Sequence, residues 1–69
     1  MEIKSRVPGM VVSVDVKVGD AVEARAKLGV LEAMKMEQPI LSPVAGTVAK
    51  VEIAAGDRVK AGQVMIVVE

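Results

Sequence analysis

The stretch Gly19-Asp20-Ala21-Val22 recurs 37 residues later as Gly56-Asp57-Arg58-Val59, and this recurrence decides the fold. A glycine beside an acidic residue is a turn signal, and here each signal is followed by a valine at the same distance. Two equal turns at one fixed separation indicate an internal duplication, which has to be tested before any other organisation of the chain.

The repeat extends outward from these turns in both directions without a gap. Residues 3–32 align with residues 40–69, and twelve of the thirty pairs are identical. Chance agreement in a valine-rich chain would explain some of the valine pairs, but not the matched Gly-Asp pairs or the lack of gaps. The identical pairs are Ile3/Ile40, Ser5/Ser42, Val7/Val44, Gly9/Gly46, Val11/Val48, Val14/Val51, Gly19/Gly56, Asp20/Asp57, Val22/Val59, Ala24/Ala61, Val30/Val67 and Glu32/Glu69.

Each copy has the hydropathy pattern of β-strands. In the first copy, valines alternate with polar residues, which predicts a half-buried strand over residues 12–18. Each copy then closes on an apolar strand, over residues 28–31 and 64–68. Two copies that each leave one face uncovered can bury those faces against each other. We therefore expect an all-β fold, a small flattened β-barrel or sandwich (a barrel-sandwich hybrid) of two quasi-symmetric four-stranded halves.

Residues 21–38 allow a competing interpretation as a helix. The segment is rich in helix-favouring residues, and Glu23 and Lys27 have the i,i+4 spacing of a helical pair. However, Gly29 would interrupt this helix, and the repeat partner of the segment ends in the strand-like run Met-Ile-Val-Val-Glu. We therefore expect strands here.

The composition excludes several classes of function. The chain has no Cys, His, Phe, Trp or Tyr, so it has no disulfide, thiol nucleophile, imidazole base or common zinc cluster, and no ring to stack on a nucleobase. Nine basic and nine acidic residues cancel, which argues against a nucleic-acid partner. No apolar run approaches the ~20 residues of a membrane span, and no signal peptide is visible. We expect no membrane insertion and a cytoplasmic location.

Only residues 33–39 lie between the two copies. If both flanks are strands, this connection is a tight hairpin with Lys35 near its tip. Two-residue hairpin turns need φ > 0 and favour Asn-Gly or Asp-Gly, so Met-Lys is a poor turn sequence, and such a conflict is expected at a functional site. The repeat also equates Glu32 with Glu69, which predicts that Lys35 and the C-terminus lie at opposite ends of the domain.

The run Glu32-Ala33-Met34-Lys35-Met36, set between two copies of a β-repeat, resembles the attachment motif of biotin carboxyl carrier proteins. The resemblance includes Pro8-Gly9, the run over residues 42–48 and both Gly-Asp-x-Val turns. It covers nearly the whole chain and implies a single biotinyl-type carrier domain over residues 1–69, with the repeat at 3–32 and 40–69 and the modified lysine on the hairpin at 33–39.

By this resemblance, Lys35 is the lysine that biotin protein ligase joins to biotin through an amide. Met34 and Met36 would help the partner enzymes recognise biotinyl-lysine. Glu32 and Ala33 complete the motif, and Glu32 resembles the acidic residue that ligases read near the lysine. The implied cofactor is biotin on Lys35, with no catalytic residue and no metal ligand in the domain.

The resemblance also implies a function. The domain would be a non-catalytic carrier that moves carboxylate between the biotin carboxylase and the carboxyltransferase of a biotin-dependent carboxylase, with an acyl-CoA as the expected acceptor. Tethering would replace a dilute encounter with an effective concentration in the ~mM range.

Three alternatives compete with this interpretation. A lipoyl domain, which carries acyl or aminomethyl groups in a 2-oxo acid dehydrogenase or glycine-cleavage system, shares the fold and the hairpin lysine. Its motif has Asp before the lysine and Ala after it, where this chain has Met34 and Met36. An unmodified scaffold, such as those within membrane-fusion adaptor proteins, would leave the motif unexplained. An enzyme using Lys35 as a Schiff-base nucleophile would need a desolvated lysine, which a hairpin tip does not provide.

Three positions bear on the local structure. Arg25 stands where its repeat mate is Gly62, so a turn with φ > 0 would strain it. Pro39 cannot donate a ladder hydrogen bond, which predicts an edge strand or a bulge. No insertion separates Gly9 from Gly19, where some carriers of acetyl-CoA carboxylases bear a protruding thumb, and this argues against that subclass.

Overall fold

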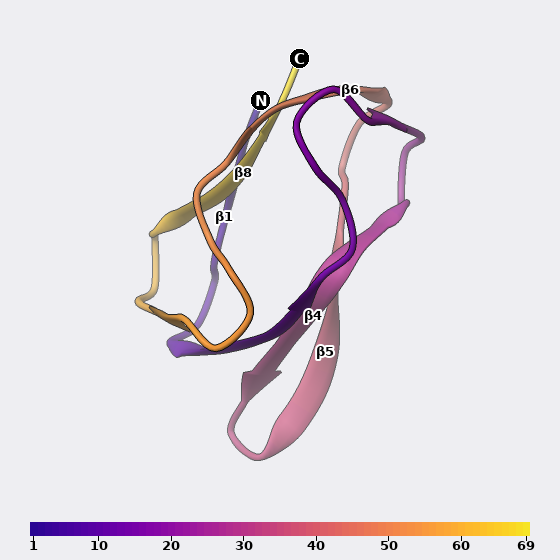
Figure 1. The fold of residues 1–69 in the computed structure, drawn as a ribbon. Helices are drawn as coiled ribbons and strands as arrows, with labels where there is room; N and C mark the ends of the chain where they lie inside the picture. The colour runs from indigo at the N-terminus through magenta and orange to yellow at the C-terminus, as the bar shows by residue number, and fades with distance from the viewer.

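The computed structural model describes all 69 residues, and it contains eight β-strands and no helix (Figure 1). The all-β expectation is therefore confirmed, and strands occupy the segment that could have been read as a helix. With no helix present, none is long and apolar enough to cross a membrane. The strands are β1 (Glu2–Lys4), β2 (Gly9–Val14), β3 (Ala21–Val22), β4 (Lys27–Ala33), β5 (Met36–Leu41), β6 (Gly46–Val51), β7 (Arg58–Val59) and β8 (Val64–Val68).

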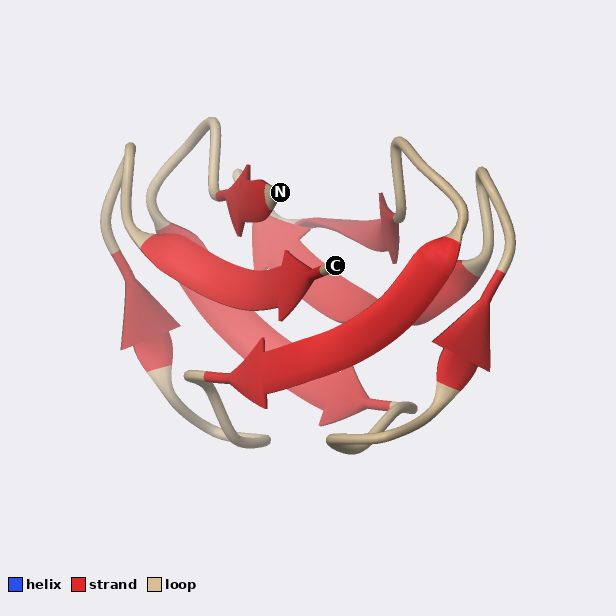
Figure 2. Ribbon diagram, turned by 90° about the horizontal axis from the view of Figure 1, so that it is seen from above, coloured by secondary structure: helices blue, strands red, loops and turns tan.

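The strands form two four-stranded antiparallel sheets, ordered β1-β8-β6-β3 and β5-β4-β2-β7. In the repeat, β1 corresponds to β5, β2 to β6, β3 to β7 and β4 to β8. Exchanging these mates turns the first strand order into the second. The pseudo-two-fold axis therefore exchanges the sheets, which face each other in Figure 2. Each sheet takes two strands from each copy, so neither copy forms a sheet alone.

The core between the sheets is aliphatic and repeats with the sequence. Val11 and its mate Val48 are 0% and 1% exposed. The buried polar residues are also mates: Ser5 and Ser42 each donate a hydroxyl hydrogen bond to a backbone carbonyl two residues further on. Stiff β-branched side chains pack well on a pleated sheet, which explains how a chain without aromatic residues closes a core.

The strand expected over residues 12–18 ends at Val14, so that prediction is wrong in its length. Val14 and Val16 pack against the core as a half-buried strand requires, whereas Val12 and Val18 are exposed. A β-bulge between Val11 and Ser13 shifts the pairing with β4, so Val11 faces the core and Val12 is exposed. The chain then turns, and the Lys17 amide donates a 3.0 Å hydrogen bond to Oδ2 of Asp20. The alternation of valines could not reveal the bulge.

Two local predictions are confirmed. Pro39 lies in β5, at the edge of its sheet, where a missing N–H breaks no ladder on the open side. Arg25 has φ of 70°, in the left-handed region, and its mate Gly62 has φ of 86°. Arg25 therefore occupies a conformation that favours glycine.

The β4–β5 hairpin projects from one end of the domain, and both termini lie together at the other end (Figure 1). The molecule measures 30 × 17 × 17 Å. The prediction that Lys35 and the C-terminus lie at opposite ends is confirmed.

Candidate functional site

Lys35 lies at the tip of the β4–β5 hairpin. Ala33 pairs with Met36, so Met34 and Lys35 are the two turn residues, with φ of 53° and 65°. Two consecutive positive φ values are the requirement of a type I′ hairpin turn. The connection predicted over residues 33–39 is thus a turn of only two residues, because β4 continues to Ala33 and β5 begins at Met36. Each non-glycine residue held in this region is strained by roughly 1–2 kcal/mol, so the turn keeps Met-Lys at a cost in stability.

The side chains at the tip are exposed, whereas the residue at its base is buried. Met34 and Met36 are 87% and 65% exposed, and Ala33 is 3% exposed. Lys35 is exposed as well. Two exposed methionines place soft, adaptable apolar surface on both sides of the amine, which suits recognition by another protein.

Two glutamates face each other across the hairpin below the tip. Glu32 pairs directly with Glu37, and both are exposed. Like charges in directly opposed cross-strand positions are destabilising, so this pair does not serve the stability of the hairpin. The ion pairs of the structure, Lys4–Glu2 at 3.9 Å and Lys27–Asp15 at 3.8 Å, involve none of the motif residues.

The chemistry of this tip fits the acceptance of a carboxyl group in an amide. The primary amine of Lys35 is exposed and takes part in no ion pair, so an activated acyl group can approach it. A Schiff-base lysine is instead desolvated in a pocket, which does not describe this position. The hairpin exposes the amine at its turn, and the residues of the motif, Glu32 to Met36, lie together around it.

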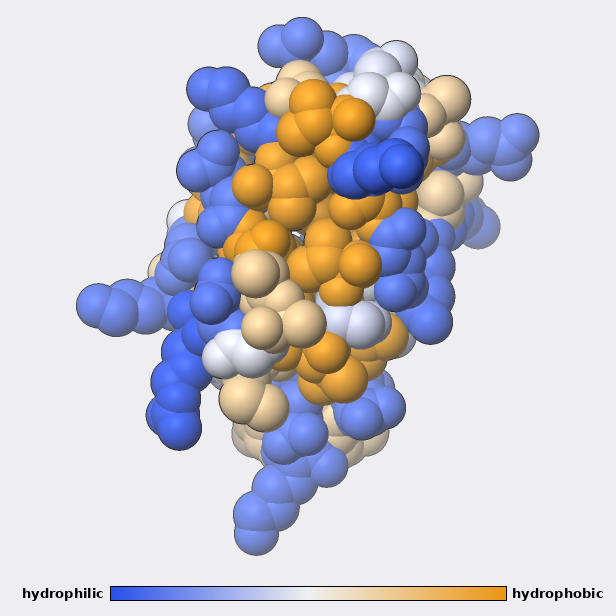
Figure 3. Space-filling model, viewed as in Figure 1, coloured by the Kyte–Doolittle hydropathy of each residue, from blue (hydrophilic) through white to orange (hydrophobic).

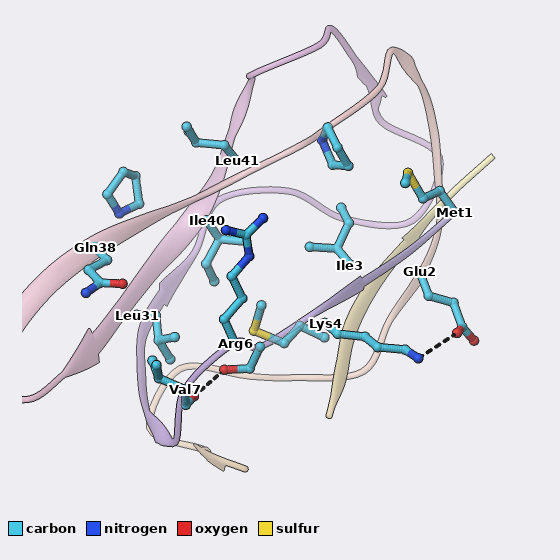
Figure 4. Close-up of a pocket in the computed structure, with 14 residues that line it drawn as sticks. Met1, Glu2, Ile3, Lys4, Arg6, Val7, Leu31, Gln38, Ile40 and Leu41 are labelled. Atoms are coloured by element: carbon cyan, nitrogen blue, oxygen red, sulfur yellow. Dashed lines mark hydrogen bonds and ion pairs between the residues drawn. The ribbon is translucent and has the colours of Figure 1, made fainter. Parts of the chain in front are cut away.

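Two of the hollows on the surface lie near the residues of the site. The larger, about 620 Å³, lies between the edge strands β1 and β5, where apolar residues gather along the middle of one face (Figure 3). Arg6 lies over this groove, with Ile3, Leu31 and Ile40 among its lining residues (Figure 4). The smaller, about 430 Å³, lies beside the hairpin and is lined by Pro8, Gly9, Met10, Glu32, Ala33, Met34 and Arg58.

The smaller hollow contains residues that sequence analysis did not assign to the site. Glu32, Ala33 and Met34 belong to the motif, but Met10 and Arg58 come from distant parts of the chain. They reach the hairpin because β2 pairs with both β4 and β7. No local pattern signals such non-local pairing, although the repeat shows that Met10 and Arg58 differ from their mates.

A sequence model of the family described as "Biotin-requiring enzyme" matches residues 1–68. The chain belongs to this family of biotin-attachment domains. Biotin, covalently bound, is the cofactor of such a biotinyl domain, and the domain itself is a carrier and not a catalyst. The resemblance seen in the sequence is thereby confirmed.

Several known proteins are similar to this biotinyl domain. It is 42% identical to the mitochondrial propionyl-CoA carboxylase alpha chain of Homo sapiens, over 97% of this chain and 9% of the relative. It is 43% identical to the biotin carboxyl carrier protein of Streptococcus mutans, over 88% of this chain and 47% of the relative. It is 36% identical to the biotin/lipoyl attachment protein of Bacillus subtilis, over 96% of this chain and 90% of the relative.

Among solved structures, the biotinyl domain superposes on part of the Kluyveromyces lactis urea carboxylase with a TM-score of 0.92 and 32% identity, over 100% of this chain and 6% of that one. The high score extends over both sheets, so the barrel-sandwich architecture is shared. The chain spans less than half the length of the human and streptococcal relatives.

Proposed function

We propose that Lys35 carries the biotin and that the domain moves carboxylate between a biotin carboxylase and a carboxyltransferase within a biotin-dependent carboxylase. The observation that carries this proposal is the position of Lys35, an exposed amine in a strained two-residue turn inside Glu32-Ala33-Met34-Lys35-Met36. No other lysine of the chain lies in the connection between the two repeats.

Attachment is an amide formation in which this chain supplies the nucleophile. The neutral Nζ of Lys35 attacks the carbonyl carbon of an activated biotinyl group, the activating group leaves with the electron pair of its bond, and the nitrogen loses a proton. The positive charge of the side chain disappears in this step. Because no acidic side chain pairs with Nζ, a biotin protein ligase has to supply the base and the activated acyl group.

The geometry of the domain suits transport. The bound biotin would hold the carboxylate, and this chain would position the biotin. The β4–β5 hairpin holds Lys35 at one end of a 30 Å domain, away from the termini through which a longer protein would continue. Met34 and Met36 flank the tether as apolar contacts for the partner enzymes. Tethering raises the local concentration of the carried group to the ~mM range.

The similar proteins are named for different carboxyl acceptors. The human relative is named for propionyl-CoA, which supports an acyl-CoA acceptor, while the similar yeast structure is named for urea. We assign an acyl-CoA as the acceptor. In this proposal the carboxyltransferase selects the acceptor.

A lipoyl carrier is the second candidate, because the Bacillus subtilis relative is named for both biotin and lipoyl attachment. The two groups use the same fold and the same kind of hairpin lysine. The methionines on both sides of Lys35 favour biotin, since the lipoyl motif has Asp and Ala there.

The deciding experiment is the intact mass of the protein after incubation with biotin protein ligase, biotin and ATP, and in parallel with a lipoate ligase, lipoate and ATP. A single biotinyl increment on a peptide containing Lys35 is the expected result. A lipoyl increment without a biotinyl one would move the protein to the second candidate. No increment from either ligase on a folded sample would refute both.

A further inference from the structure

The outer face of the second sheet carries a row of three exposed side chains beside the hairpin. Met10 on β2 pairs with Glu32 on β4 and with Arg58 on β7, so the three side chains lie side by side, with Met10 in the middle. All three are exposed, and Met10 is 39% exposed. Neither Glu32 nor Arg58 takes part in an ion pair.

The fold does not require this row. At the far end of the domain, the repeat mates of Arg58 and Met10 are Ala21 and Thr47, which pair with each other in the same way. The same backbone therefore accepts a methyl group and a small hydroxyl at these places. Only the end that bears Lys35 has the guanidinium and the thioether.

The three residues line the hollow of about 430 Å³ together with Met34 and Pro8. Because β4 and β7 flank β2 at a strand spacing of ~4.8 Å, they are ~10 Å apart. The lining of the hollow thus combines two methionines with an anionic acceptor on one side and a cationic donor on the other.

We propose that this hollow binds the ring system of the biotin carried on Lys35 of the same chain while no partner enzyme is engaged; the proposal rests on the function proposed above. The ureido group of biotin offers N–H donors and a carbonyl acceptor. Glu32 accepts from an N–H, and Arg58 donates to the carbonyl. Hydrogen bonds of ~2.9 Å on each side of this small group fit the ~10 Å between the two strands. Met10 and Met34 contact the thioether ring.

The tether allows this placement without any change in the backbone. Met34, which lines the hollow, is the direct neighbour of Lys35. Two residues along a strand cover ~7 Å. The lysine side chain and the valeryl chain of biotin together are longer than this distance, so the ring can reach from the turn into the hollow. Since the ring is tethered, weak contacts suffice to hold it. A partner enzyme then has to displace the ring from the hollow, which ties release of the cofactor to recognition of the hairpin.

The five methionines of the chain make a direct test possible. Met10 and Met34 line the hollow, whereas Met1 and Met65 line the groove between β1 and β5. In a sample with ¹³C-labelled methionine methyl groups and biotin on Lys35, we expect nuclear Overhauser contacts from the biotin ring protons to the methyls of Met10 and Met34. Contacts to Met1 and Met65 would place the ring in the other groove and overturn the proposal. Contacts to turn residues alone, without Met10, would also overturn it.

Matched variants identify the polar partners. Arg58→Ala and Met10→Thr introduce the residues that the far end already has, so both variants should fold. Arg58→Ala should lower the ratio of docked to free ring about tenfold, the scale of one hydrogen bond to a charged group, seen as loss of the Met10 contact. Arg6→Ala, in the larger groove, is the control and should leave that contact unchanged.

The experiment distinguishes failure of the proposed function from failure of the docking proposal. The intact mass of each sample is measured first, and absence of biotin from Lys35 would refute the proposed function. A biotinylated sample without the Met10 contact, or one in which Arg6→Ala and not Arg58→Ala removes it, would refute the docking alone.

Discussion

Arg25 and Gly62 occupy equivalent positions in the two repeats and share the same left-handed backbone, with φ of 70° and 86°. Each amide donates a hydrogen bond to the carbonyl of a buried serine, Arg25 to Ser42 at 2.6 Å and Gly62 to Ser5 at 2.7 Å. The turn therefore imposes its conformation whichever residue stands there. Arg25 is held in it at a cost that glycine avoids.

Replacing Arg25 by glycine should stabilise the protein. Relief of a left-handed strain of roughly 1–2 kcal/mol outweighs the entropy cost of glycine of about 0.5–1 kcal/mol. We expect Arg25→Gly to raise the free energy of unfolding by ~0.5–1 kcal/mol, measured by denaturant unfolding. The reverse exchange, Gly62→Arg, should lower it by a similar amount, and a loss of stability in Arg25→Gly would contradict this account.

Lys35→Arg should abolish biotin incorporation without unfolding the domain. The guanidinium keeps the positive charge but is not deprotonated at neutral pH, so it cannot attack an activated acyl group. The position is exposed, so the free energy of unfolding should change by less than ~0.5 kcal/mol. Incorporation is read from the intact mass after ligase treatment. Lys60→Arg serves as the control and should be labelled normally; labelling of Lys35→Arg would exclude Lys35 as the attachment site.

The double variant Met34→Leu with Met36→Leu should separate recognition from stability. Both side chains are exposed, so the free energy of unfolding should move by less than ~0.5 kcal/mol. Leucine is branched and less adaptable than methionine, so turnover by the ligase or the carboxylase should slow. Steady-state rates with the variant as substrate give the readout. Normal rates combined with a large loss of stability would mean that the methionines serve the structure.

Gly9 and Gly46 permit a paired test of the hairpin base. A β-carbon on Gly9 would overlap the carbonyl oxygen of Glu32, and one on Gly46 would overlap that of Glu69 and lie 2.9 Å from Val68 Cγ1. Each change to alanine should lower the free energy of unfolding by about 1–3 kcal/mol.

Only Gly9→Ala disturbs the strand that leads to Lys35, so only this variant should also slow biotin incorporation at temperatures where both variants are folded. The measurement is the rate of labelling by the ligase, with thermal unfolding recorded on the same samples. Equal labelling rates for the two variants would show that the hairpin tolerates displacement at its base.

The duplication is the reason that so much of the fold could be predicted from the sequence. Each copy constrains the reading of the other, so the strand that resembled a helix, the glycine-like turn at Arg25 and the hairpin around Lys35 followed from alignment of the two copies. The edge position of β5 followed from the chemistry of Pro39 alone. The motif residues 32–36 were predicted together, and the hairpin places them together.

The bulge in β2 and the hollow beside the hairpin were not predicted, and both depend on pairing between strands that are distant in the sequence. The bulge between Val11 and Ser13 depends on the pairing of β2 with β4, and it moved the buried face from Val12 to Val11. The hollow beside the hairpin depends on the pairing of β2 with β7, which brings Arg58 to Met10. Alternation and turn signals are local, so neither arrangement could be read from them.

The exchange of strands between the sheets makes the domain equivalent to two short chains that wrap around each other and have been fused into one. Separate chains of this kind would have to find each other in solution, and their folding would weaken on dilution. The turn at Met34 and Lys35 converts that encounter into the closing of a loop within one molecule, which is independent of concentration. The residue proposed to receive the cofactor thus sits in the covalent link that lets this small protein stay folded at any dilution.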